Sequence, residues 1–160
     1  MIDIKALLPP SHVLIDVAAN DRAALWRALA QPLLAEGILL DVEVFLRDLD
    51  RREKQITTRV TERVALPHAR SNAVRRLGIA VAILPEPGLS YDDDHEGLCR
   101  VCFLIAIPAF APTAHLPVLQ HLAAFAIDEP RVDKLLTAKT AALAAKQIVT
   151  FKPLAVPAGA

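Results

Sequence analysis

The chain has 160 residues, of which 54% are hydrophobic, a size and composition that fit one domain with a substantial buried core. Its 18 basic and 18 acidic residues cancel, so there is no strong overall field to attract nucleic acid or an anionic membrane. Aromatic residues make up only 4% of the chain, which leaves little material for a base-stacking surface. We therefore expect no nucleic-acid partner.

The N-terminal residues give no sign of export. Charged residues interrupt the apolar stretch 1–10, and no small-residue cleavage site follows it, unlike a secretory signal. No apolar run approaches the roughly 20 residues that a membrane span requires. These features predict a cytoplasmic protein that does not insert into a membrane.

The first third of the chain predicts one strand and two helices. The β-branched segment 12–17 fits a first strand. Helical spacing of apolar residues predicts a helix over 22–36, which Pro32 should bend or break because a proline removes an interior hydrogen bond. A second helix is expected over 42–55, where Asp41 can cap the N-terminus.

The middle of the chain predicts three further strands, over 63–66, 77–84 and 101–107. The last two are nearly continuous apolar runs, as is typical of central strands that are covered on both faces. A Pro/Gly/Asp-rich turn region, 85–97, separates them. Helices should therefore lie on both sides of the sheet.

The last third predicts three helices. Thr113 can cap the first, which runs to about residue 126, and the others are expected over 130–136 and 138–149. The order β-α-α-β-β-β-α-α-α predicts an α/β protein, a three-layer α/β/α fold with a mixed β-sheet.

No interdomain linker or internal repeat interrupts the pattern. We therefore expect a single domain over residues 1–152. The remaining segment, 153–160, predicts a flexible tail.

Two cysteines, Cys99 and Cys102, stand at the start of the apolar strand 101–107. Their C-x-x-C spacing fits redox or zinc chemistry, but a reactive pair usually sits at a helix N-terminus and zinc needs more ligands. Packing within the core is the preferred interpretation. We expect no metal and no cofactor.

Most of the five histidines can be assigned ordinary roles. His12 opens a strand without a catalytic neighbour and is expected at an edge or surface. His95 lies in the acidic segment 91–97, whose spacing is not that of a calcium loop, so a solvated turn is expected. His115 and His121 are six residues apart, about 240° around one helix, and cannot both address one site.

His68 has the most informative surroundings. Pro67 fixes its own φ and offers no ladder donor, so the strand Arg63–Leu66 should end there, with the imidazole projecting beyond its end. From these residues alone, His68 is either a reactive group or a polar residue in a turn. The choice depends on whether other chemical groups converge on it.

A spaced set of motifs runs through residues 5 to 150. The motifs are Arg52-Glu53, Thr57-Thr58, Val64-Ala-Leu-Pro-His68-Ala69, Val101-Cys-Phe-Leu-Ile-Ala-Ile-Pro108 and His115-Leu-Pro-Val-Leu-Gln-His-Leu-Ala123. In these motifs the chain resembles the enzyme IIA domains of the bacterial phosphoenolpyruvate-dependent phosphotransferase system, of the fructose, mannitol and nitrogen-regulatory type. It is most similar to the nitrogen-regulatory form.

The resemblance implies a phosphocarrier. His68 matches the phosphorylated histidine of the family, Arg52 an arginine near the phosphoryl group, and His115 the second histidine of the site. Thr58 is expected to help line the site, and Arg59 to supply a further phosphate donor. A neutral imidazole is the required nucleophile, and the arginine offers planar, bidentate donors to phosphoryl oxygens.

The resemblance also implies the partners. Upstream is a small histidine-containing phosphocarrier protein, and downstream is a regulatory protein or an enzyme IIB. Where the family commonly has a glycine-rich loop, this chain has Thr58-Arg-Val-Thr-Glu-Arg63, without glycine. The altered loop leaves a second hypothesis open, a binding module that has lost phosphotransfer and regulates a partner by docking.

Overall fold

The computed structural model describes residues 3–154, so the predicted tail lies outside the described residues from position 155 onward. The helices are α1 (Ile4–Leu7), α2 (Arg22–Ala35), α3 (Val42–Gln55), α4 (Leu116–Ile127), α5 (Glu129–Leu135) and α6 (Ala141–Val149), with a 3-10 turn, η1, at Pro10–His12. The strands are β1 (Val13–Ile15), β2 (Val64–Ala65), β3 (His68–Ser71), β4 (Gly78–Ile83) and β5 (Val101–Pro108).

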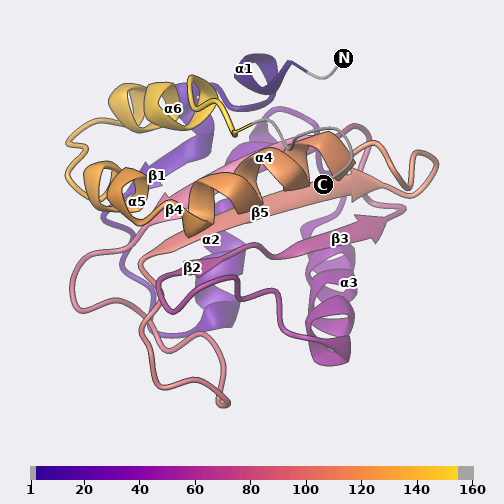
Figure 1. Ribbon diagram of the computed structural model, residues 1–160. Helices are drawn as coiled ribbons and strands as arrows, with labels where there is room; N and C mark the ends of the chain where they lie inside the picture. The colour runs from indigo at the N-terminus through magenta and orange to yellow at the C-terminus, as the bar shows by residue number, and fades with distance from the viewer. Residues whose placement is uncertain (1–2, 155–160) are drawn as a thin grey trace, which may run out of the picture.

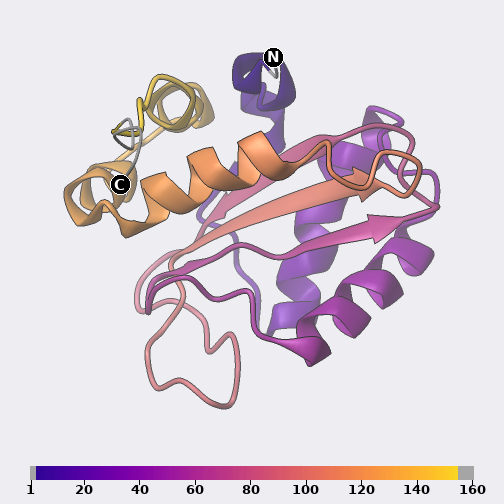
Figure 2. The same ribbon diagram turned by 45° about the vertical axis from the view of Figure 1, so that its right-hand side comes forward.

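The strands form one mixed sheet. β1 pairs with β4 in parallel, β4 pairs with β5 antiparallel, and both β2 and β3 pair with β5 in parallel. Helices α2 and α3 cover one face of this sheet, and α4, α5 and α6 lie on the other (Figures 1 and 2). The predicted three-layer α/β/α fold is confirmed, with one more strand and one more N-terminal helix than the sequence indicated.

The two layers of the core follow from alternation along the central strands. In β4, Ala80 and Ala82 pack with the α2 and α3 side, whereas Val81 and Ile83 pack with the helices of the opposite side. The small side chains let α2 approach the sheet closely. Every residue of β4 and β5 is buried, as the continuous apolar runs predicted.

The strand at the edge of the sheet differs from the prediction. It does not end at Leu66, because the chain continues along β5 beyond Pro67 in one unbroken register, from Val64 opposite Val101 to Ser71 opposite Pro108. Pro67 lacks an N–H, yet its carbonyl still accepts from Ile105 N at 2.9 Å. Consequently His68 is the first residue of β3 and does not project beyond a strand end.

Two local expectations are corrected and a third is narrowed. Of the bend or break predicted at Pro32, the break is absent, because α2 runs continuously from Arg22 to Ala35. Thr113 does not cap α4; its carbonyl accepts from Leu116 N in the turn that precedes the helix. His12 is buried rather than exposed, with its Nδ1 2.9 Å from the carbonyl oxygen of Ile79.

None of the helices within residues 3–154 combines the length and apolarity needed to cross a bilayer.

Candidate functional site

A cavity of about 420 Å³ lies where α3, β3 and the start of α4 meet, at the edge of the sheet. Its lining is more polar than apolar and brings together residues that are far apart in the sequence. They are Asp48, Arg51, Arg52, Gln55, His68, Ala69, Arg70, Ile107 and His115. The three residues that the sequence singled out most strongly therefore line one cavity.

The position of His68 follows from the strand that carries it. Residues two apart on a strand share a face, so His68 and Arg70 point to the same side while Ala69 packs into the core. The His68 Nδ1 lies 2.8 Å from the carbonyl oxygen of Leu66. Because a carbonyl only accepts, Nδ1 carries the proton, and the lone pair of the neutral ring is on Nε2.

His115 reaches the cavity from the opposite side. It is the N-cap residue of α4, it is 4% exposed, and its ring centroid lies 5.9 Å from that of His68 with the planes inclined by 30°. Among the described residues its buried Nδ1 has no hydrogen-bond partner. Such a nitrogen is rare in a folded protein, and His115 is one of the residues that line the cavity.

Both imidazoles are held in the neutral form. Burial lowers the pKa of His68 below its ordinary value, and the positive charge of Arg52 adds to this effect, while the hydrogen bond to Leu66 opposes it. Burial also lowers the pKa of His115, with further contributions from His68 and Arg70. The cavity therefore presents two uncharged rings at neutral pH, one of which has a nucleophilic nitrogen available.

Two arginines beside these rings are fixed by backbone carbonyls. Arg52, in the last turn of α3, donates from Nη1 to the carbonyl of Ile56 at 3.0 Å. Arg70 donates from Nε to the carbonyl of Pro112 at 2.9 Å, which ties β3 to the segment before α4. Each guanidinium keeps further N–H groups for an anion, and the planar fork of donors matches phosphoryl oxygens.

Thr58 does not line the cavity. Its hydroxyl lies 2.5 Å from Oε2 of Glu53, its backbone N–H donates to Oε1 at 2.8 Å, and the carboxylate of Glu53 is buried. The Thr57 hydroxyl lies 2.9 Å from Oδ2 of Asp92 and 3.2 Å from Oε1 of Glu53, so its one proton serves either carboxylate. Thr58 therefore fastens the following loop to the C-terminal end of α3, directly beside Arg52.

Arg59 is also outside the cavity. Its side chain is 2% exposed and points into the loop region, where Nη1 lies 3.4 Å from Oδ1 of Asp92. Its remaining donors are taken by the carbonyls of Thr61, Glu62 and Gly97. The structure thus gives Arg59 a structural environment instead of the phosphate-binding position expected from the sequence.

Gly97 allows the glycine-free loop to approach the segment before β5 closely. A Cβ at Gly97 would lie 2.8 Å from Cβ of Glu62 and 3.0 Å from Nη2 of Arg59. The loop and the segment around Gly97 pack against each other, and neither is part of the cavity wall.

Arg70 and Gln55 are site residues that the sequence reasoning missed. Arg70 stands two residues after His68, and a continuing strand would have placed both on one face. Because Pro67 predicts the end of the strand, the sequence did not indicate that His68 and Arg70 lie on one face. Gln55 gave no comparable signal, because it is an ordinary polar residue in the last turn of a helix.

The other candidates for chemistry lie elsewhere. Cys99 and Cys102 are buried. Burial raises the pKa of the Cys99 thiol to about 11, and it raises the pKa of the Cys102 thiol well above its ordinary value. Packing in the core is thus confirmed for both. His95 lies in an exposed turn, 2.8 Å from Oδ1 of Asp92. A second hollow of about 520 Å³, between α2 and α3, contains no histidine or cysteine among its lining residues.

Comparison with known proteins agrees with this site. Residues 6–149 match the family described as phosphoenolpyruvate-dependent sugar phosphotransferase system, EIIA 2, and the chain belongs to this family. The motifs from Arg52 to Ala123 that suggested the resemblance all lie within the matched region.

Relatives of several kinds are similar to the chain. It is 27% identical to the nitrogen regulatory protein of Pseudomonas aeruginosa, covering 88% of this chain and 91% of that protein. It is 26% identical to a fructose-specific EIIA component of Haloferax volcanii, covering 86% and 89%. It is 32% identical over 124 residues to the 2-O-α-mannosyl-D-glycerate-specific EIIABC component of Escherichia coli, covering 76% of this chain but only 19% of that longer protein.

The fold has close counterparts among solved structures. The nitrogen regulatory protein IIA-Ntr of Neisseria meningitidis superimposes with a TM-score of 0.81 at 26% identity, covering 91% of this chain and 98% of that one. IIA mannitol of Escherichia coli gives a TM-score of 0.73 at 20% identity, covering 88% and 98%, which is a likeness of fold.

Proposed function

We propose that this protein is a phosphocarrier of the phosphoenolpyruvate-dependent phosphotransferase system that accepts a phosphoryl group on Nε2 of His68 and acts mainly in regulation. The observation that carries the proposal is the convergence of His68, His115 and Arg52 on one polar cavity. Membership of the EIIA family gives the reaction class. The similarity to nitrogen regulatory proteins in both sequence and fold supports the regulatory role.

His68 needs no prior deprotonation to act as the nucleophile. Nε2 of the neutral ring carries a lone pair, so the P–N bond of a phosphohistidine donor breaks while the P–Nε2 bond forms, and no proton has to leave His68 beforehand. Nδ1–H keeps its hydrogen bond to Leu66, which holds the ring in this tautomer and orientation. The lowered pKa of His68 keeps the nucleophile available at and somewhat below neutral pH.

The neighbouring groups are placed to stabilise the transferring phosphoryl group. In phosphoryl transfer, charge spreads over three equatorial oxygens, so catalysis depends on positioning and on fixed donors. Arg52 and Arg70 supply cationic N–H groups on two sides of the cavity, and His115 supplies a buried imidazole on a third. Thr58 contributes indirectly, by anchoring the loop beside Arg52 through Glu53.

The glycine-free loop does not block this site. Residues 58–63 are absent from the lining of the cavity, and Arg59 is turned toward Asp92 and Gly97. This supports phosphotransfer over the alternative of a module that only docks.

The proposed partners are a small histidine-containing phosphocarrier upstream and a regulatory protein or an enzyme IIB downstream. One solved relative of this fold is a complex of enzyme IIA mannitol with phosphorylated enzyme IIB from Escherichia coli. That complex supports an enzyme IIB as one class of acceptor.

Incubation with phosphoenolpyruvate and the upstream carriers of the source organism, followed by intact and peptide mass spectrometry, tests the proposal. We expect one acid-labile phosphate on His68, no label in His68→Gln, and slow labelling in His115→Gln. His121→Gln is a matched control, since His121 is bonded to the Ile148 carbonyl, away from the cavity, and should be labelled as the wild type is. A wild type that stays unlabelled by carriers that label their own enzyme IIA contradicts the proposal.

A further inference from the structure

The hollow of about 520 Å³ between α2 and α3, here called the α2–α3 hollow, has the size of a small-molecule site. Its lining residues recur every three or four positions along each helix, so each helix contributes one continuous face. They are Ala23, Trp26 and Arg27 of α2 and Glu43, Leu46, Arg47, Asp50, Arg51 and Lys54 of α3. The hollow is therefore distinct from the cavity that contains His68 and His115.

The floor of the α2–α3 hollow is apolar and its rim is cationic. Trp26 is 3% exposed and Leu46 is half-buried, whereas Arg47, Arg51 and Lys54 are exposed. Four basic and two acidic residues line the hollow, which gives a formal charge of +2. An apolar floor beneath a cationic rim matches a ligand with an apolar body and an anionic group.

Most of the charges around the hollow are already paired. Arg27 of α2 bonds to Glu43 of α3 at 2.5 Å, and Lys54 lies 2.8 Å from Asp50. Arg47 forms no ion pair with any residue in the part of the chain that the structure describes. Its guanidinium is therefore available to an anion, and its planar donors suit a carboxylate.

We propose that the α2–α3 hollow binds a small aromatic carboxylate, with its ring against Trp26 and Leu46 and its carboxylate on Arg47. A monoanion matches a single unpaired guanidinium better than a phosphate dianion does. A cationic ligand is disfavoured by the formal charge of +2.

Arg51 connects this hollow to the site of His68, because it lines both. Its Nη1 lies 3.5 Å from Oδ1 of Asp48, a residue of the cavity, and its side chain is 76% exposed, so this pair is weak and easily exchanged. A carboxylate in the hollow attracts Arg51 and leaves the negative charge of Asp48 unbalanced beside the phosphoryl group. Binding should therefore slow phosphorylation of His68. This consequence rests on the proposed function, whereas the ligand site does not.

A proton–nitrogen NMR titration with 2-naphthoate tests the ligand site. Trp26 is the one tryptophan of the chain, so its indole N–H signal reports on this hollow. We expect saturable shifts of this signal and of amides in α2 and α3, with a dissociation constant below about 1 mM. 2-Naphthamide, which has the same shape without the charge, should bind at least about tenfold more weakly. No saturable shift at Trp26, equal binding of the amide, or tighter binding of 2-naphthyl phosphate overturns the proposal.

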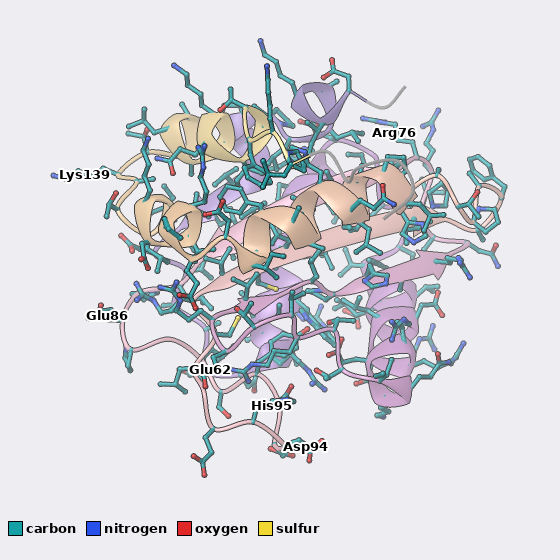
Figure 3. The ribbon with its side chains drawn as sticks, viewed as in Figure 1. Glu62, Arg76, Glu86, Asp94, His95 and Lys139 are labelled. Atoms are coloured by element: carbon teal, nitrogen blue, oxygen red, sulfur yellow. The ribbon has the colours of Figure 1, made fainter. Side chains whose placement is uncertain are left out.

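Arg47→Gln is the matched variant, because it removes the unpaired guanidinium from an exposed helix position. It should weaken binding of 2-naphthoate at least about tenfold and leave that of 2-naphthamide unchanged. Lys139→Gln makes the same change in net charge and is the control, since Lys139 lies beside α5 and α6, on the other side of the sheet (Figure 3). An Arg47→Gln variant that binds as the wild type does, or an equal loss in Lys139→Gln, contradicts the assignment.

The rate of His68 labelling with and without saturating 2-naphthoate tests the connection. The wild type should be slowed about threefold, whereas Asp48→Asn should show nearly the same rate with and without the probe, because the charge that Arg51 balances is gone. Arg47→Gln at the same probe concentration controls for effects on the upstream carriers and should be slowed less.

The two proposals fail separately. If the wild type is never labelled but Trp26 still responds to 2-naphthoate, phosphotransfer is wrong and the ligand site stands. If labelling occurs and Trp26 does not respond, the ligand site alone is wrong. If the probe binds and the rate of labelling is unchanged, the connection through Arg51 is wrong.

Discussion

At the scale of single residues, one hydrogen bond decides which ring nitrogen of His68 carries the free lone pair. The Leu66 carbonyl can only accept, so it selects the tautomer with the proton on Nδ1 and leaves the lone pair on Nε2, the nucleophile of the proposed reaction. Leu66 and His68 flank Pro67, and the paired edge strand holds all three against β5. Backbone geometry therefore fixes the position of the nitrogen that is proposed to react; among the described residues the ring's hydrogen-bond partner is a carbonyl and not a carboxylate.

The arginines separate into two roles that substitution should reveal. Arg70→Ala removes a cationic donor from the cavity and should slow phosphorylation of His68 about 100-fold, with little change in melting temperature. Arg59→Ala removes the buried ion pair with Asp92 and leaves three carbonyls without this donor, and should lower the free energy of unfolding by about 3 kcal/mol. Stopped-flow labelling and urea denaturation measure the two quantities. The reverse outcome, a stable but inactive Arg59→Ala, would place Arg59 in the site after all.

At the scale of elements, the site depends on how the loop after α3 is fastened. Glu53 in the last turn of α3 accepts hydrogen bonds from the backbone N–H and the hydroxyl of Thr58. Arg59 then crosses to Gly97 in the segment before β5. This chain of contacts fixes the end of α3, and with it Arg52, relative to the sheet.

Gly97→Ala tests the close packing of this loop. The added Cβ would meet Cβ of Glu62 at 2.8 Å, so the two segments must separate, at a cost of about 1–3 kcal/mol. Chemical denaturation should show the loss of stability. Ala114→Gly, which lies away from this contact, is the control. Gly37→Ala is unsuitable as a control, because the φ of +70° at Gly37 would itself strain an alanine. A Gly97→Ala variant as stable as the wild type would show that the loop does not pack as described.

The sequence predicted the elements well where one signal dominated. The bounds of α3 are as expected, because Asp41 caps it and its apolar residues keep one face. The prediction that the strand ends before Pro67 was wrong. At the edge of the sheet, one missing N–H does not interrupt the register. Arg70 was missed for this reason. The prediction that Thr113 caps α4 was wrong, because a turn follows Thr113 and the helix begins only at Leu116, directly after the cavity residue His115.

At the scale of the whole molecule, convergence on the site was beyond the reach of sequence spacing. Arg52, His68 and His115 come from α3, β3 and the start of α4, and only the pairing of β3 with β5 brings the three together. The three residues that the family resemblance named line one cavity. It did not place Thr58 and Arg59, whose environment depends on the loop particular to this chain.

The two neutral histidines of the site, His115 buried and His68 partly buried, should make the whole fold sensitive to acid. Their pKa values are lowered in the folded protein, so below about pH 6.5 the unfolded chain binds more protons than the folded one. The free energy of unfolding should therefore be flat above neutrality and fall as the pH drops below about 6.5. Urea denaturation from pH 5 to pH 8 measures it. In a His68→Gln, His115→Gln variant the slope should be shallower, and an unchanged slope would assign the acid sensitivity to other groups.

Nitrogen NMR of the phosphorylated protein tests the central claim most directly. With ¹⁵N-labelled histidine and phosphoenolpyruvate-driven phosphorylation, long-range proton–nitrogen spectra identify the ring nitrogen that carries phosphorus. The structure predicts phosphorus on Nε2 of His68, with Nδ1 still protonated and bonded to Leu66. Phosphorus on Nδ1, or on the ring of His115, would contradict the account.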